Sequence, residues 1–442
     1  MREMKLLAAM LVLSLGMWIS SVSAADDAAE WPWWRGLNHD GKSPDTGLLK
    51  EWPPGGPELL WQADGLGTGY STVAVRDGFV YTTGDVGDKL VLFAFDMNGK
   101  PRWKIPVDRA YTRSHPGSRS TPTVDGDSLY LLSGNGLFAS FNAKTGRQNW
   151  SKDLRSFGGR PSKWGYAESV LIYKNLAIVK PGGDNCIMAF NKSTGETVWQ
   201  SKGFRAGPEY SSCVPFTYNQ MPLLATGTRA GIVCVSAKTG ELLWSNGWCT
   251  NNTANCPDPV YADSFIFWAN GYGKGGICLK LSASDGKVSA QEVWTTRDMA
   301  CHHGGYIVHE GHIYGNHSGG WSCLELKTGR QKWYEKAVGK GSLCFADGML
   351  YLFAERGGRA ALATCSPDGM EIKGRVTVEG TGTSWAHPVV IGGRLYLRYA
   401  DNLYCFDVKA KKSLMIVSVG SDSSGRKRKR LHIEPLFPPH QR

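Results

Sequence analysis

"NAKTGRQNW" at Asn142–Trp150 and "NKSTGETVW" at Asn191–Trp199 are two copies of one pattern, a Thr-Gly pair followed after three residues by a tryptophan. The pattern returns at Thr239 and Thr328, and looser copies bring the closing positions to 61, 103, 150, 199, 244, 294, 333 and 376. A spacing of roughly 40 to 50 residues is typical of a four-stranded propeller blade. The sequence therefore predicts eight blades.

Each unit also contains an earlier tight turn between apolar runs, such as Asp77-Gly78 or Asp347-Gly348, where glycine permits a positive φ. The stretch Glu58–Gln62, "ELLWQ", is an outer strand without preceding inner strands, whereas the last unit ends near Phe406 without its own tryptophan. Pairing the two completes the eighth blade and removes the open sheet edge. We predict an all-β fold, an eight-bladed β-propeller of four-stranded antiparallel blades that is closed by an N-terminal outer strand.

The repeated tryptophans are suited to packing between neighbouring blades, because an indole buries a large apolar surface while its N–H finds an acceptor. We expect this structural, blade-docking role for the following tryptophans: Trp61, Trp103, Trp150, Trp199, Trp244, Trp294 and Trp333.

The N-terminus has the features of a cleaved secretory signal: two basic residues, an apolar run from Leu6 to Ile19, and small residues before a cut after Ala24. No cysteine follows the cut to accept a lipid, and no second long apolar run predicts a transmembrane span. We expect a periplasmic or secreted protein. The predicted organisation is a signal peptide at 1–24, an N-terminal extension at 25–56, the propeller at 57–409 and a basic, disordered tail at 410–442.

The formal net charge is +11, but the segment from Lys409 onward carries nine of the basic and two of the acidic residues, which leaves about +4 for the rest. The body is only mildly basic, so we expect no specific nucleic-acid partner. The basic run "GRKRKR" fits a solvated tail, with electrostatic adhesion to nucleic acid or an anionic surface as the alternative.

Eleven cysteines in an exported protein suggest disulfides. Several of them, however, occupy a strand position that other units fill with alanine or serine, which indicates small buried residues. The pair Cys249 and Cys256 flanks an asparagine-rich loop, and we predict a local disulfide there.

In a propeller, the start of each inner strand and the loop before it face the central channel. Counting back from the hairpin glycines places a polar and aromatic set at one channel mouth: Tyr70, Arg119, Glu168, Tyr210, His302, His303, Trp385 and His387. This set predicts either a binding funnel or a wet channel mouth whose polar groups satisfy strand ends. Adjacent histidines in an extended strand point in opposite directions, so we expect no metal site, and we assign no catalytic residue.

The repeat and three further stretches, "GYSTVAVRDGFVY" (69–81), "CHHGGYIVHEGHIYG" (301–315) and "WAHPVVIGGRLYLR" (385–398), resemble the exported PQQ-like β-propeller repeat proteins. The chain is similar to the propeller lipoprotein that helps to assemble outer-membrane proteins and, more distantly, to quinoprotein alcohol dehydrogenases. The resemblance spans about Trp31 to Val408. It implies the fold, whereas function depends on sites built upon it.

The quinoprotein resemblance implies an adjacent Cys-Cys pair over the quinone and carboxylate and amide ligands to calcium, and neither is recognisable here. We therefore expect no cofactor, with PQQ and calcium as the alternative. The sequence favours an exported binding or assembly scaffold, monomeric, whose partners are exported or envelope proteins or a small ligand. A PQQ-dependent alcohol or polyol dehydrogenase remains the alternative.

Overall fold

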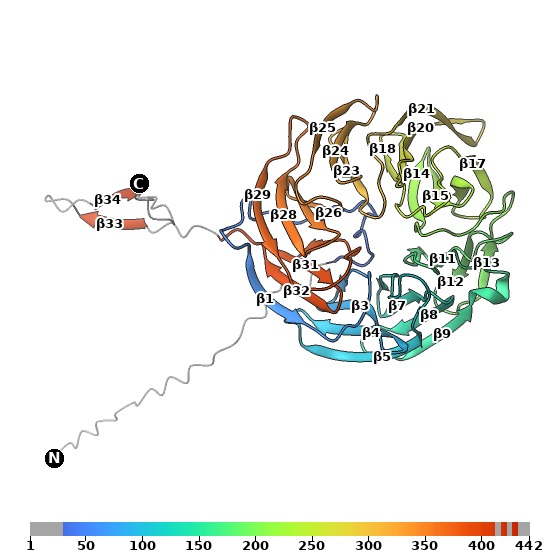
Figure 1. Cartoon of the computed structure of the whole chain (residues 1–442), viewed down its shortest axis with the longest axis horizontal. Coiled ribbons are helices and arrows are strands. Elements are labelled where there is room, and N and C mark those ends of the chain that lie inside the picture. Colours follow the sequence, from blue (N-terminus) through green and yellow to red (C-terminus); the bar gives the residue numbers. More distant parts are fainter. Residues whose placement is uncertain (1–29, 412–416, 422–426, 432–442) are drawn as a thin grey trace, which may run out of the picture.

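Eight four-stranded antiparallel sheets form a closed ring in the computed structural model, which describes residues 30–411, 417–421 and 427–431 (Figure 1). The predicted fold class and the number of blades are confirmed. Apart from one short 3-10 helix, η1 (Leu154–Phe157), the described elements are strands. Among the described residues, no helix has the length and apolar character needed to cross a membrane.

The blades follow one another in chain order, and each runs from an inner to an outer strand. The first four blades are β2 (Ala74–Arg76), β3 (Phe79–Val86), β4 (Lys89–Asp96) and β5 (Pro101–Arg109); β6 (Thr123–Asp125), β7 (Ser128–Leu132), β8 (Leu137–Asn142) and β9 (Gln148–Asp153); β10 (Leu171–Tyr173), β11 (Leu176–Val179), β12 (Met188–Asn191) and β13 (Thr197–Gln200); and β14 (Val214–Tyr218), β15 (Met221–Thr228), β16 (Gly231–Ser236) and β17 (Leu242–Asn246). The next three are β18 (Val260–Ala262), β19 (Phe265–Asn270), β20 (Gly275–Ser284) and β21 (Lys287–Thr296); β22 (Tyr306–His309), β23 (His312–His317), β24 (Gly320–Glu325) and β25 (Gln331–Glu335); and β26 (Gly341–Ala346), β27 (Met349–Ala354), β28 (Arg359–Thr364) and β29 (Ile372–Thr377).

The eighth blade joins the two ends of the propeller. Its inner strands are β30 (Val389–Ile391), β31 (Arg394–Tyr399) and β32 (Asn402–Asp407), and its outer strand is β1 (Glu58–Ala63). β1 pairs antiparallel with β32, and Trp61 lies opposite Cys405. The predicted closure is confirmed, and β32 is paired on both sides, with β31 and with β1.

The repeated Asn-x-x-Thr-Gly string is a hydrogen-bonded turn. In the second blade, the side chain of Asn142 accepts hydrogen bonds from the backbone N–H of Lys144 and of Thr145, at 3.2 and 2.9 Å. The following Gly146 has a φ of 73°, a left-handed conformation that costs glycine little. The same bonds recur at Asn191 in the third blade. Local turn chemistry therefore explains why this string is repeated.

The turn glycine also makes room for the tryptophan of the preceding blade. Trp150 donates its indole N–H to the carbonyl of Lys192 at 3.0 Å, and a Cβ on Gly195 would lie 2.9 Å from the Trp150 ring. Equivalent contacts pair Trp61 with Gly99, Trp103 with Gly146, Trp199 with Gly240 and Trp294 with Gly329. Trp333 donates to Ser366 in the next blade at 2.9 Å, whereas the indole nitrogens of Trp199 and Trp244 find no partner within the described part of the chain.

The segment before β1 crosses one end of the channel, where its blue trace enters the ring (Figure 1). Trp31 exchanges backbone hydrogen bonds with Val75 of the first blade, and Trp33 donates its indole N–H to Val170 beside the third. Arg35 then reaches the carbonyl of Tyr306 in the sixth blade at 2.7 Å. This segment, Trp31 to Arg35, is an internal plug that links distant blades.

Two of the predicted segments lie at the ends of the chain. The predicted signal peptide at 1–24 lies outside the described residues. In the tail, β33 (Val417–Ser421) and β34 (Lys427–Leu431) pair as an antiparallel hairpin, and most of the remaining segment predicted to be disordered lies outside the described residues.

Candidate functional site

A chain of hydrogen bonds joins the inner strands of the first five blades around the channel. The backbone N–H of Thr72 donates to the hydroxyl of Thr121, that of Thr121 to Ser169, and that of Ser169 to Ser212, at 3.0 to 3.1 Å. The N–H of Ser212 continues the series to the carboxylate of Asp258 at 2.6 Å. We call Thr72, Thr121, Ser169 and Ser212 the hydroxyl wall. Its side chains satisfy strand ends, as the wet-channel alternative proposed.

The hydroxyl wall is one side of a cavity of about 270 Å³ that the plug segment closes at its base. Residues from several blades surround it: Trp34, Tyr70, Thr72, His115, Arg119, Thr121, Trp164, Ala167, Ser169, Tyr210, Ser212, Ala254, Cys256, Tyr272, His302, His303, Trp385 and His387. Seven of the eight residues that the strand count assigned to the channel mouth are in this lining. The structure therefore brings them together, although they come from distant parts of the chain.

Glu168 is the residue that lies elsewhere. Its neighbours Ala167 and Ser169 line the cavity, while Glu168 is buried behind the wall and accepts a hydrogen bond from the backbone N–H of Lys180 at 2.5 Å. Successive residues in an extended segment point in opposite directions, so the strand count was wrong by one position. Burial raises the pKa of Glu168 to about 7.

Aromatic rings form the second feature of the cavity. Tyr70 stacks on Trp385 with ring centroids 4.3 Å apart, and the guanidinium of Arg119 lies 5.6 Å from the centre of the Tyr70 ring. Arg119 also donates to the carbonyls of His115 and Gly117, which fixes its position, and burial lowers its pKa. The cavity thus offers flat apolar surfaces beside one guanidinium group, that of Arg119, whose position is fixed.

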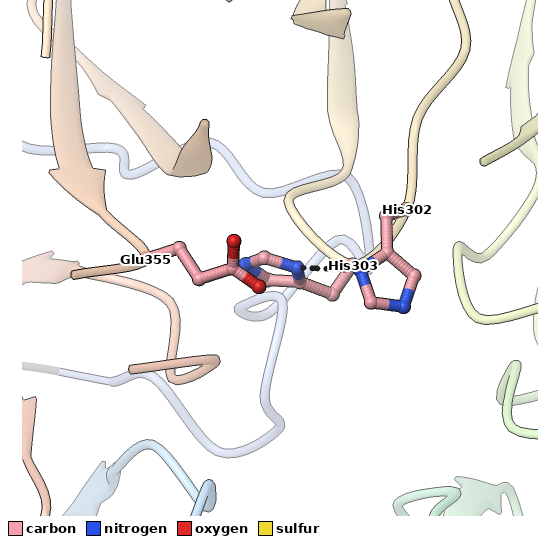
Figure 2. Close-up of side chains that lie close together, drawn as sticks. All are labelled: His302, His303 and Glu355. Carbon is pink, nitrogen blue, oxygen red and sulfur yellow. Dashed lines mark hydrogen bonds between the residues drawn. The ribbon is translucent and has the colours of Figure 1, made fainter. Parts of the chain in front are cut away.

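A cluster of imidazoles forms the opposite side, and we call His302, His303 and His387 the histidine wall. The two neighbouring histidines lie with their Nδ1 atoms 3.3 Å apart (Figure 2). The expectation that they point in opposite directions is wrong, because residues 302–304 form a bend and β22 begins only at Tyr306. Burial lowers the pKa of His302 and of His387 to about 4, and that of His303 well below its ordinary value, so all three are neutral at pH 7.

The groups that support the histidine wall were not predicted from the sequence. Lys340 donates to His302 Nδ1 at 2.8 Å and to Glu355 Oε1 at 3.0 Å, and Trp385 donates to the same carboxylate oxygen at 2.9 Å. Although burial alone raises it, the bonds from Trp385 and Lys340 keep the pKa of Glu355 below its ordinary value. Lys340 and Glu355 lie just outside β26 and β27, at positions that the count of inner-strand starts did not include.

The residue at the base of the cavity, Trp34, was also not predicted from the sequence. Trp34 of the plug segment packs edge-on against His387 at 4.9 Å, and His387 Nε2 bonds to the carbonyl of His303 at 2.9 Å. The plug has no repeat pattern that would place it in the channel. The run "WPWW" before the first blade was the available signal, because tryptophans at this density require a packing surface.

The predicted Cys249–Cys256 disulfide is absent, and both thiols are free. The Cys249 thiol instead donates toward the carbonyls of Trp268 and Gly275 in the fifth blade, at 3.2 and 3.1 Å. Cys256 lines the cavity. The loop between the two cysteines therefore separates thiols with different surroundings. Their proximity in the sequence did not imply a disulfide.

The cavity does not fit the calcium ion that a quinoprotein site requires. Calcium takes about six to eight oxygen ligands, chiefly carboxylates and carbonyls. Among the described residues that line the cavity, none is an aspartate or glutamate, and the nearby Glu355 is already bonded to Lys340 and Trp385. The polar side chains of the lining are mainly imidazoles, phenols and hydroxyls, which do not fit a PQQ–calcium centre.

The fold and the docked tryptophans define an eight-bladed propeller of PQQ-like repeats. A family model described as outer membrane protein assembly factor BamB matches residues 53–200 and 183–341, which together span more than half of the 442 residues. The chain belongs to this family. No curated protein matches the sequence.

Solved structures with the same fold differ in function. BamB from Moraxella catarrhalis is similar with a TM-score of 0.58 and 14% identity, over 80% of this chain and 99% of that one. Quinohemoprotein alcohol dehydrogenase from Comamonas testosteroni is similar with a TM-score of 0.61 and 13% identity, over 89% and 83%. A computationally designed protein, Ika8, reaches 0.56 with 10% identity, over 80% and 100%. At such identities the likeness shows the fold alone.

Proposed function

We propose that the chain is an exported binding or assembly scaffold that captures its ligand in the cavity at the channel mouth. Its family supports this role, because the family's description names an assembly factor. The export itself rests on the N-terminal sequence at 1–24. The partner is an exported or envelope protein that inserts a side chain or loop, or a small molecule of the same chemistry.

The observation that supports this proposal most directly is the composition of the cavity. Trp164, Tyr210, Tyr70 and Trp385 provide aromatic faces, and Arg119 provides a fixed positive charge. The lining has no acidic residue in the part of the chain that the structure describes. Such a cavity favours a flat apolar group that carries a hydrogen-bond acceptor or a negative charge.

The test compares capture by two arginine variants. Arg119→Ala removes the cavity's charge, whereas Arg205→Ala changes a side chain that is 73% exposed on the surface. Ligands retained from an extract of exported proteins and metabolites are identified by native mass spectrometry. We expect the wild type and Arg205→Ala to retain the same ligand and Arg119→Ala to lose it. Equal retention by all three proteins contradicts the proposed site.

The dehydrogenase alternative is tested with PQQ and calcium. Saturable binding of PQQ, together with turnover of an alcohol and an artificial electron acceptor, would replace the scaffold proposal with the quinoprotein one. Because the side chains of the cavity do not match the ligands that calcium prefers, we expect neither saturable PQQ binding nor alcohol turnover.

A further inference from the structure

His302, His303 and Glu355 bring three potential metal ligands together on one side of the cavity (Figure 2). One ligand atom from each lies within 4.8 Å of the others. The two histidines precede β22 in the sixth blade, and Glu355 directly follows β27 in the seventh, so the cluster spans a blade junction. We propose that these three side chains bind a divalent transition-metal ion of the zinc type and leave one coordination position open to the cavity.

The geometry fits such an ion. The Nδ1 atoms of His302 and His303 are 3.3 Å apart. Two nitrogens that bind one tetrahedral zinc at about 2.0 to 2.1 Å lie about 3.3 to 3.4 Å from each other. The imidazole pair is therefore already at the required separation, and the carboxylate of Glu355 needs only a small movement to complete the set.

The chemistry of the donors selects the metal class. Two imidazoles and one carboxylate are typical of open zinc sites and of other first-row divalent ions, whereas calcium and magnesium prefer oxygen ligands alone.

Neighbouring groups are arranged as a metal site requires. His302 Nε2 lies 3.1 Å from the hydroxyl of Tyr272, a contact that leaves Nδ1 as the ligating nitrogen. The indole of Trp385 donates to Glu355 Oε1 and orients the carboxylate.

Lys340 is the natural competitor of the metal. Its ammonium bridges His302 Nδ1 and Glu355 Oε1, two of the three ligands. Metal binding requires this side chain, which is 31% exposed, to swing away. The site therefore predicts that removal of the Lys340 ammonium strengthens metal binding. If the cluster instead bound a ligand with the help of Lys340, removal of Lys340 would weaken binding.

The experiment titrates tag-free protein with Zn²⁺ by calorimetry and with Co²⁺ by visible absorption, which reports tetrahedral nitrogen ligation directly. We expect one ion per chain. His303→Ala and Glu355→Gln each lower the affinity by about 100-fold or more, beyond the effect of losing an outer-shell partner. Lys340→Met raises it by about tenfold or more, because a nearby positive charge is removed.

His115→Ala is the matched control, since His115 lines the same cavity but is not in the cluster. Unchanged affinity in this variant supports the site. Absence of saturable Zn²⁺ binding by the wild type overturns the proposal, and so does equal weakening by His115→Ala or weaker binding by Lys340→Met. Melting curves confirm that each variant is folded. Metal binding does not depend on which ligand the cavity captures, so the outcome is separate from the test of Arg119.

Discussion

The hydroxyl wall and the histidine wall face each other across one cavity, but they use their polar groups differently. The hydroxyls of Thr121, Ser169 and Ser212 each accept the backbone N–H of the wall residue in the preceding blade, so their polarity serves the ring itself. His302 and His303 interrupt this pattern, and a buried ring nitrogen of His303 has no partner among the described residues. Where the repeat is kept, polar groups maintain the scaffold, and where it is broken, they are available for a ligand.

The largest effect is expected far from both walls, at the docked tryptophans. Trp199 is buried and packs against Gly240, where a Cβ would lie only 2.5 Å from its ring. Trp199→Ala should lower the free energy of unfolding by about 3 to 5 kcal/mol through the cavity it leaves between the blades. Denaturant unfolding measures this loss. A change near zero would show that the blades do not depend on this contact.

The two sides of the cavity should respond to pH with opposite signs. Burial lowers the pKa of His387 from 6.5 to about 4, so the folded state binds fewer protons than the unfolded state between these values. Stability is therefore lost as the pH falls from 6.5 to 4. His387→Gln lacks this loss, and its unfolding free energy relative to the wild type should rise by about 3 kcal/mol over that range.

Glu168, behind the hydroxyl wall, titrates in the other direction. Burial raises its pKa from 4.5 to about 7, so the folded state binds more protons than the unfolded state between these values. Stability is lost as the pH rises from 4.5 to 7, and Glu168→Gln should gain about 3 kcal/mol on the wild type over that rise. Unfolding curves at several pH values give, for each variant, the slope against pH of its unfolding free energy relative to the wild type. Slopes of the same sign for the two variants would contradict the distinction between the two sides of the cavity.

Much of the fold was predictable because each blade repeats the same local chemistry. The Thr-Gly turn and its tryptophan recur, in exact or looser copies, at a spacing of roughly 40 to 50 residues, so they predicted both the blade count and the closing strand. The cavity was less accessible to this reasoning. An error of one residue reverses a side chain in an extended segment, as at Glu168, and the bend at His302 and His303 carries no repeat signal. Lys340 and Trp34 lie outside the repeat, and only folding brings them to the cavity.

A smaller effect is expected within the hydroxyl wall. Thr121→Val removes the hydroxyl that accepts the N–H of Thr72 and leaves that buried donor unpaired. The free energy of unfolding should fall by about 1 to 3 kcal/mol. Thr121→Ser keeps the acceptor and should recover most of the loss, which denaturant unfolding of the three proteins measures. If valine and serine behave alike, the hydroxyl contributes little, and the ring of hydrogen bonds is not what holds the wall.

The smallest effect is expected beyond the ring, at the end of the chain. Removal of residues 411–442 leaves the pairing of β1 with β32 intact and also keeps the backbone bond from Ala410 to Gly47. The unfolding free energy should change by less than about 0.5 kcal/mol, as for most surface changes.

A longer truncation, from 402 to 442, is the matched control. It removes β32, which lies between β31 and β1, so the eighth blade loses its continuity and the N-terminal strand loses its partner. We expect the shorter truncation to melt with the full chain and the longer one to give no cooperative transition. A large loss of unfolding free energy in the shorter truncation would show that residues after 410 stabilise the propeller.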